Sequence, residues 1–168
     1  LYGFRKFVIV VPSIAIYEGT IKTFEVTKAH FNKLYGNDHV HLTRYDGQQI
    51  SKLRGFAGSQ FIEILIITID SFNKVSNIIF KPTEKLPGEK RPYQYIQETR
   101  PILILDESQN YRSALSRAAL RTLNPLFAIN YSATPVDKPN LVYRLSPVDA
   151  FKQNLVKKIE VLGVTEEH

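Results

Sequence analysis

Two adjacent acids stand directly after a short apolar run. Residues 102–105 read Ile-Leu-Ile-Leu, and Asp106, Glu107, Ser108 and Gln109 follow them. A run of this length is typical of a strand buried on both faces, as in the middle of a parallel sheet, and open α/β sheets bind ligands beyond the carboxyl ends of such strands. One acid could therefore hold Mg²⁺ while the other orients or deprotonates a water, as in nucleotide hydrolysis. A polar turn or helix cap is the plainer alternative.

A second turn, rich in hydroxyl groups, lies downstream. Residues 126–129 are apolar and lead to Ser132 and Thr134 in the sequence Ser-Ala-Thr-Pro. Between the two strands, residues 111–123 carry apolar or small side chains at helical spacing, which predicts a β-α-β unit with both turns at one edge of a sheet. Taken alone, Ser-Ala-Thr would be an ordinary capping turn before a proline.

A third strand near the start of the chain ends in the same way. Residues 7–11 are apolar and end at Pro12 and Ser13, and a helical pattern follows over residues 16–35. A helix that begins beyond the end of a buried strand offers free N–H groups, which favour a phosphate.

The other expected elements are short. They are strands at residues 40–45, 62–69, 141–145 and 157–164, a helix at residues 93–98, and a helix opened by Ser146 and Pro147. Residues 81–92 hold prolines and charges, which predicts an exposed loop. Residues 48–60 show only a weak pattern.

Composition limits the class of protein. A length of 168 residues, 43% of them hydrophobic, suits one α/β domain. The formal charge of +6 is compatible with a polyanionic partner. The sequence has no cysteine, which argues against disulfides and thiolate metal sites and suits a cytoplasmic protein. The longest apolar stretch is too short to span a membrane. His39 and His41 have no third metal ligand nearby, which favours a structural or surface role.

Several segments match, in order, the motifs of one family: residues 7–19 (FVIVVPSIAIYEG), 69–74 (IDSFNK), 95–97 (YIQ), 100–109 (RPILILDESQ), 123–128 (LNPLFA) and 131–134 (YSAT). Together they resemble the restriction (Res) subunit of type III restriction-modification enzymes, which carries a superfamily 2 helicase motor. The resemblance implies a RecA-like P-loop NTPase fold, with a mostly parallel sheet and flanking helices. Residues 1–168 would form one partial RecA-like domain with motifs Ia, II and III.

The resemblance also implies roles for the polar groups that would use ATP. Asp106 would bind Mg²⁺, and Glu107 would be the general base or water-orienting carboxylate. Gln109 would sense the phosphates or the domain interface. Ser132 and Thr134 would couple the nucleotide state to movement, by hydrogen bonding towards the acids.

A further set of residues would contact DNA. Pro12 and Ser13, with the helix that follows them, would lie near the DNA backbone. Thr68, Ser71 and Asn73 would add a second contact, although ordinary helix capping explains that trio equally well.

One departure from the family concerns the phosphate loop. That loop needs Gly-x-x-x-x-Gly-Lys-Ser/Thr to cradle and reach the phosphates, and the sequence has no Gly-Lys dipeptide. Residues 55–59 are glycine-rich but lack the lysine. We therefore expect a fragment that begins after the loop, is incomplete at its N-terminus and is inactive alone, with the second RecA-like domain and any nuclease lying elsewhere.

Two function classes stay open. The first is an ATP-dependent DNA translocase or helicase domain of a type III site-specific deoxyribonuclease, whose methyltransferase (Mod) partner would set DNA recognition. The second is a non-catalytic RecA-like module that binds nucleic acid or another partner. A Gly-Lys-Ser/Thr loop before Leu1 would favour the motor. A weaker third option, an unrelated Mg²⁺-dependent phosphohydrolase using Asp106, is disfavoured by the Ser-Ala-Thr turn.

Overall fold

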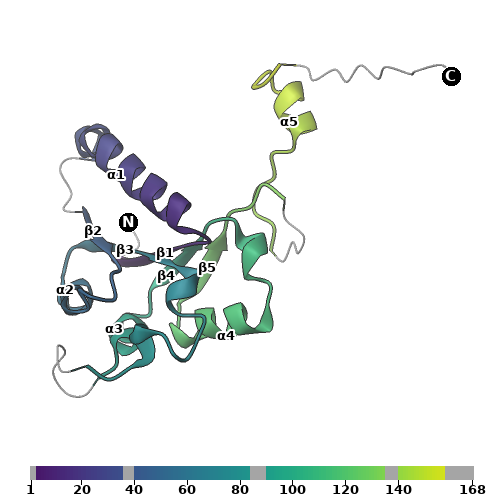
Figure 1. The fold of residues 1–168 in the computed structure, drawn as a ribbon. Coiled ribbons are helices and arrows are strands. Elements are labelled where there is room, and N and C mark those ends of the chain that lie inside the picture. The colour runs from purple at the N-terminus through teal and green to yellow at the C-terminus, as the bar shows by residue number, and fades with distance from the viewer. Residues whose placement is uncertain (1–2, 36–39, 84–89, 135–139, 158–168) are drawn as a thin grey trace. The chain divides into compact units, whose positions relative to one another are not determined.

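The computed structural model describes residues 3–35, 40–83, 90–134 and 140–157. The chain divides into two compact units, Leu1–Val136 and Asp137–His168. The first unit holds a β-sheet and its flanking helices (Figure 1). The helix described in the second unit is α5 (Pro147–Lys152).

The sheet of the first unit has five strands: β1 (Lys6–Val11), β2 (Val40–Arg44), β3 (Ile62–Thr68), β4 (Ile102–Leu105) and β5 (Phe127–Asn130). Their order is β2-β3-β1-β4-β5, and every pairing between them is parallel. The predicted α/β fold with a parallel sheet is thereby confirmed. Because all strands run the same way, the turns that follow β1, β3, β4 and β5 lie along one edge of the sheet, called here the carboxyl edge.

Helices cover both faces of this sheet. The long helix α1 (Ile14–Tyr35) lies on one face, and α2 (Ser51–Gly58), α3 (Pro92–Glu98) and α4 (Ala114–Thr122) lie on the other (Figure 1). The predicted helices at residues 16–35 and 93–98 are confirmed. Part of the predicted loop, residues 84–89, lies outside the described residues, whereas Pro92 is buried where α3 begins.

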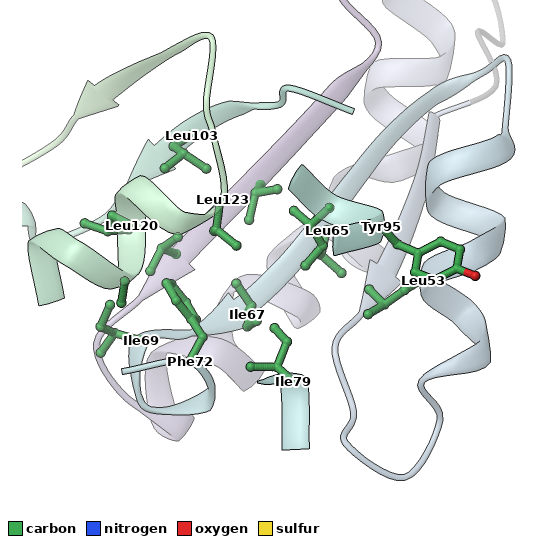
Figure 2. Packing of buried hydrophobic residues seen from close by; sticks show 14 of the residues in the cluster. Leu53, Leu65, Ile67, Ile69, Phe72, Ile79, Tyr95, Leu103, Leu120 and Leu123 are labelled. Carbon is green, nitrogen blue, oxygen red and sulfur yellow. The ribbon is translucent and has the colours of Figure 1, made fainter. Parts of the chain in front are cut away.

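The main hydrophobic core lies between the sheet and the three shorter helices. It joins strand residues with residues of the covering segments: Leu65, Ile67 and Leu103, with Leu53, Ile69, Phe72, Ile79, Tyr95, Leu120 and Leu123 (Figure 2). Strand β5 differs from its neighbours, because Phe127 and Ile129 remain 44% and 41% exposed. It is an edge strand of the described sheet.

One predicted helix begins later than expected, and one helix of the structure was not predicted. The helix expected at residues 111–123 begins only at Ala114, because the Ser113 side chain accepts the Ser116 N–H at 3.0 Å and caps it. Just before it, residues Ser108–Tyr111 form a 3₁₀ turn, η4. Helix α2 lies in the weakly patterned segment, and its buried side chains Leu53 and Phe56 pack into the core.

The second unit confirms one prediction and corrects another. Ser146 caps α5, since its hydroxyl accepts the Asp149 N–H at 3.2 Å and the Asp149 carboxylate accepts the Ser146 N–H at 2.9 Å. The strand expected at residues 141–145 is absent, because this exposed segment has no strand pairing within the described residues. Of the strand expected at residues 157–164, all but Lys157 lies outside them. None of the helices described is long and apolar enough to cross a membrane.

Candidate active site

The acidic pair occupies the turn that follows β4. The Asp106 N–H donates to the Val10 carbonyl at 3.1 Å and so extends the pairing of β4 with β1. Both acids are partly buried. Glu107 has φ 49° and ψ 51°, in the left-handed region that residues other than glycine seldom adopt. Strained residues of this kind persist only where the surrounding structure holds them, and they cluster at functional sites.

Hydrogen bonds hold the strained turn in place. The backbone N–H of Asn110 and its side-chain amide donate to the Glu107 carbonyl at 2.9 Å and 3.1 Å. The Ser108 N–H donates to the Tyr131 carbonyl, just beyond β5, at 3.0 Å. A left-handed residue costs about 1–2 kcal/mol, and hydrogen bonds of about 1 kcal/mol each offset that cost.

A polar chain connects the acidic turn with the Ser-Ala-Thr turn. The Gln109 amide donates to Oε2 of Glu107 at 2.5 Å, and the Ser132 hydroxyl donates to Oε1 of Gln109 at 2.5 Å. The Thr134 backbone N–H donates to the Ser132 hydroxyl at 3.1 Å and orients it. Hydrogen bonds from Ser132 and Thr134 towards the acids were expected; in the structure Ser132 bonds to Gln109, which stands between it and Glu107, and Thr134 takes part through its backbone N–H.

The residues predicted to contact DNA lie on the same edge, at the ends of β1 and β3. Val11 pairs with Thr68, so Pro12 and Ser13 lie at the end of the strand that neighbours β3. Ser13 begins α1: its carbonyl accepts the Tyr17 N–H at 3.0 Å, and its hydroxyl lies 3.3 Å from the Ile16 nitrogen. The amino terminus of the helix therefore opens at the carboxyl edge.

The turn after β3 makes local hydrogen bonds. Thr68 and Ser71 share a hydroxyl–hydroxyl bond of 2.8 Å, and the Asn73 amide donates to the Asp70 carboxylate at 2.8 Å. The carbonyl oxygen of the Asn73 side chain is buried and finds no hydrogen-bond partner within the described residues. The turn thus combines local bonds between side chains with one unsatisfied acceptor, and Thr68 makes no side-chain cap bond to the 3₁₀ turn that follows it.

Tyr111 is a site residue that the sequence did not reveal. It was expected inside a helix, but it ends η4, and its buried hydroxyl lies 2.8 Å from the Asp106 carbonyl oxygen. The only sequence signal was a tyrosine shortly after the acids, which an ordinary helix would equally explain.

The acidic turn fits Mg²⁺ in the way that this ion is usually bound. No three His, Cys, Asp or Glu side chains gather into a metal-binding group within the described part of the chain. Mg²⁺ commonly takes one or two carboxylates and fills its other positions with water and substrate phosphates, so the residue that could hold it here is Asp106. His41 instead pairs with the buried Glu63 at 2.9 Å, in line with the structural role expected.

Comparison with known proteins gives one consistent result. A family model described as "Type III restriction enzyme, res subunit" matches residues 2–137. Similar curated proteins include the Res subunits of three type III restriction-modification enzymes: EcoP15I of Escherichia coli (27% identical, over 94% of this chain and 18% of the relative), StyLTI of Salmonella typhimurium (28%, 95% and 20%) and EcoPI of Escherichia phage P1 (25%, 94% and 18%). The chain thus spans 18–20% of the length of these relatives.

Proposed function

Because this chain belongs to the family of type III restriction enzyme Res subunits, we propose that it supplies the hydrolytic acids of an ATP-driven motor that moves along DNA. The family resemblance drawn from the sequence is confirmed, and the helicase-type domain has the parallel sheet of a RecA-like fold. The observation that carries the proposal is the Ser132–Gln109–Glu107 chain, which joins two turns at the edge where such sheets bind ligands.

In this proposal the two acids divide the work. Asp106 holds Mg²⁺, which when bound neutralises charge on the ATP phosphates. Glu107 orients the attacking water and accepts its proton. The Gln109 amide donates to Oε2 of Glu107, which leaves Oε1 to meet the water. The left-handed backbone of Glu107 fixes the carboxylate before substrate arrives, so the hydrolytic geometry needs little reorganisation.

The same chain offers a route for coupling. A change in the phosphates that moves Gln109 would change its bond to Ser132, and with it the turn that contains Thr134. DNA would lie along the ends of β1 and β3, where Pro12, Ser13 and the amino terminus of α1 meet the phosphate backbone. Thr68, Ser71 and Asn73 would add contacts beside them. The complete enzyme would be a site-specific deoxyribonuclease that acts with a Mod subunit.

The alternative function is a module that binds nucleic acid without turnover. The 168 residues contain no Gly-Lys dipeptide, and a Gly-Lys-Ser/Thr loop before Leu1 is what would distinguish the motor from this module. Because these residues lack that dipeptide, we expect the 168-residue chain alone to hydrolyse ATP negligibly.

DNA-stimulated ATP hydrolysis by the intact protein tests the proposal. Asp106→Asn should lower kcat by at least about 100-fold, in the range seen when one catalytic group is lost. Asp46→Asn is the matched control, because Asp46 follows β2, an edge strand that β3 and β1 separate from β4, and its carboxylate accepts the Gln48 N–H. Wild-type turnover by Asp106→Asn would contradict the motor. DNA binding by the wild type without any ATP hydrolysis would identify the binding module.

A further inference from the structure

Tyr111 reaches the acidic turn from the hydrophobic core. Its side chain is 3% exposed and belongs to the core cluster beneath the sheet. The hydroxyl lies 2.8 Å from the Asp106 carbonyl oxygen and 3.1 Å from the Val10 carbonyl oxygen. A single side chain therefore touches the backbone at the ends of both β1 and β4.

The shorter of these contacts identifies the acceptor. A phenol has one proton to donate, and the Asp106 carbonyl oxygen, at 2.8 Å, is nearer than the Val10 carbonyl oxygen, at 3.1 Å. The hydroxyl therefore serves the Asp106 carbonyl. That carbonyl belongs to the peptide bond between Asp106 and Glu107, so its direction is tied to the backbone angle φ of Glu107.

We propose that Tyr111 is a positioning residue for hydrolysis: its hydroxyl holds the Asp106–Glu107 peptide in the orientation that keeps Glu107 left-handed. The proposal rests on the hydrolytic role proposed for Glu107. Without the hydroxyl, the peptide can rotate and Glu107 can relax towards the right-handed region, which is favoured by about 1–2 kcal/mol. The Glu107 carboxylate would then lose its hydrogen bond from Gln109 and would no longer lie where it can orient the attacking water.

The Tyr111 hydroxyl acts as a donor, because the carbonyl oxygen that it meets can only accept.

The first test removes only the hydroxyl. In the intact protein, Tyr111→Phe should lower kcat for ATP by about 10- to 100-fold, as expected for a misplaced catalytic group, and should leave KM within about two-fold because Asp106 and the phosphate contacts persist. Tyr95→Phe is the matched control, since Tyr95 belongs to the same core cluster but lies on α3. It should keep both values. Wild-type kcat in Tyr111→Phe would overturn the inference.

A second test separates this inference from the proposed function. If Tyr111 acts through Glu107, then adding Tyr111→Phe to Glu107→Gln should cost no further activity, because interacting residues are not additive. An inactive Glu107→Gln beside an unimpaired Tyr111→Phe would overturn the positioning role alone. An active Glu107→Gln would overturn the hydrolytic role of Glu107, and the positioning role that rests on it.

Urea unfolding covers the case in which Tyr111→Phe does not fold. Glycine adopts the left-handed region without strain. Tyr111→Phe should therefore lower the free energy of unfolding by less in the Glu107→Gly background than in the wild type. Recovery of a folded protein in the Glu107→Gly, Tyr111→Phe double variant would support the inference. If Tyr111→Phe lowered the free energy of unfolding equally in the wild type and in the Glu107→Gly background, the inference would be contradicted.

Discussion

The turns that follow β4 and β3 lie on the same edge of one sheet, with only β1 between the strands, yet they are built differently. The β4 turn depends on distant partners, since Gln109 bonds to Ser132 and the Ser108 N–H to the Tyr131 carbonyl, each 23 positions away. The β3 turn joins neighbours three positions apart, Thr68 to Ser71 and Asn73 to Asp70. The long-range bonds bring distant parts of the chain together at the β4 turn, whereas the bonds of the β3 turn only join neighbouring side chains to one another.

The backbone shows the same contrast. Glu107 is left-handed, whereas Thr68, which precedes the β3 turn, is extended at φ −83° and ψ 147°. Strain and tertiary hydrogen bonds therefore coincide at the turn for which hydrolysis is proposed. A turn that only reverses the chain needs neither.

Of the two predictions that compare these turns, the larger effect is expected when the link between the β4 and β5 turns is broken. Replacing Ser132 and Thr134 with Ala in the intact protein should leave much of the ATPase activity but raise the ATP consumed per base pair travelled several-fold. Each lost hydrogen bond is worth only about 1 kcal/mol net, so the fold should persist. Thr122→Ala, which removes a hydroxyl bonded within α4, is the control. If the ATP consumed per base pair travelled were unchanged, the Ser-Ala-Thr turn would be only a structural capping turn.

A smaller effect is expected at the β3 turn. Thr68→Ala with Ser71→Ala should weaken DNA binding about two- to five-fold, because two exposed hydrogen bonds at the low end of the net range, about 0.5 kcal/mol each, together contribute about 1 kcal/mol or less. The salt dependence of binding should stay the same, since no charge is lost. Fluorescence anisotropy over a salt series measures both. Unchanged affinity with a lower urea midpoint would show that the pair serves only the local structure of the turn and would sharpen the contrast with the β4 turn.

The strands could be predicted from the sequence more fully than the helices. Buried parallel strands are short apolar runs, and β1, β3 and β4 lie where such runs occur. Helix α2 was missed because it depends on packing by Leu53 and Phe56 rather than on its own pattern. The run at residues 141–145 was wrongly predicted as a strand, since a strand also needs a neighbour, which a local pattern cannot supply.

Of the candidate site, the sequence predicted positions but not connections. The end of a strand locates Asp106 and Ser132 on one edge. It does not show that a 3₁₀ turn brings Gln109 between Glu107 and Ser132, or that the same turn directs Tyr111 back towards the Asp106 carbonyl. Those contacts depend on the left-handed backbone of Glu107. A glutamate gives no indication of this conformation in the sequence.

The most direct test of the account is single-turnover ATP hydrolysis by Glu107→Gln in the intact protein, with Mg²⁺-ATP binding measured on the same sample. The amide keeps the shape of the side chain but cannot accept a proton. We predict binding within about two-fold of wild type and hydrolysis slower by about 10² to 10⁴, the usual contribution of a general base. Hydrolysis at the wild-type rate would show that Glu107 is not the base, and that the strained turn after β4 serves another purpose.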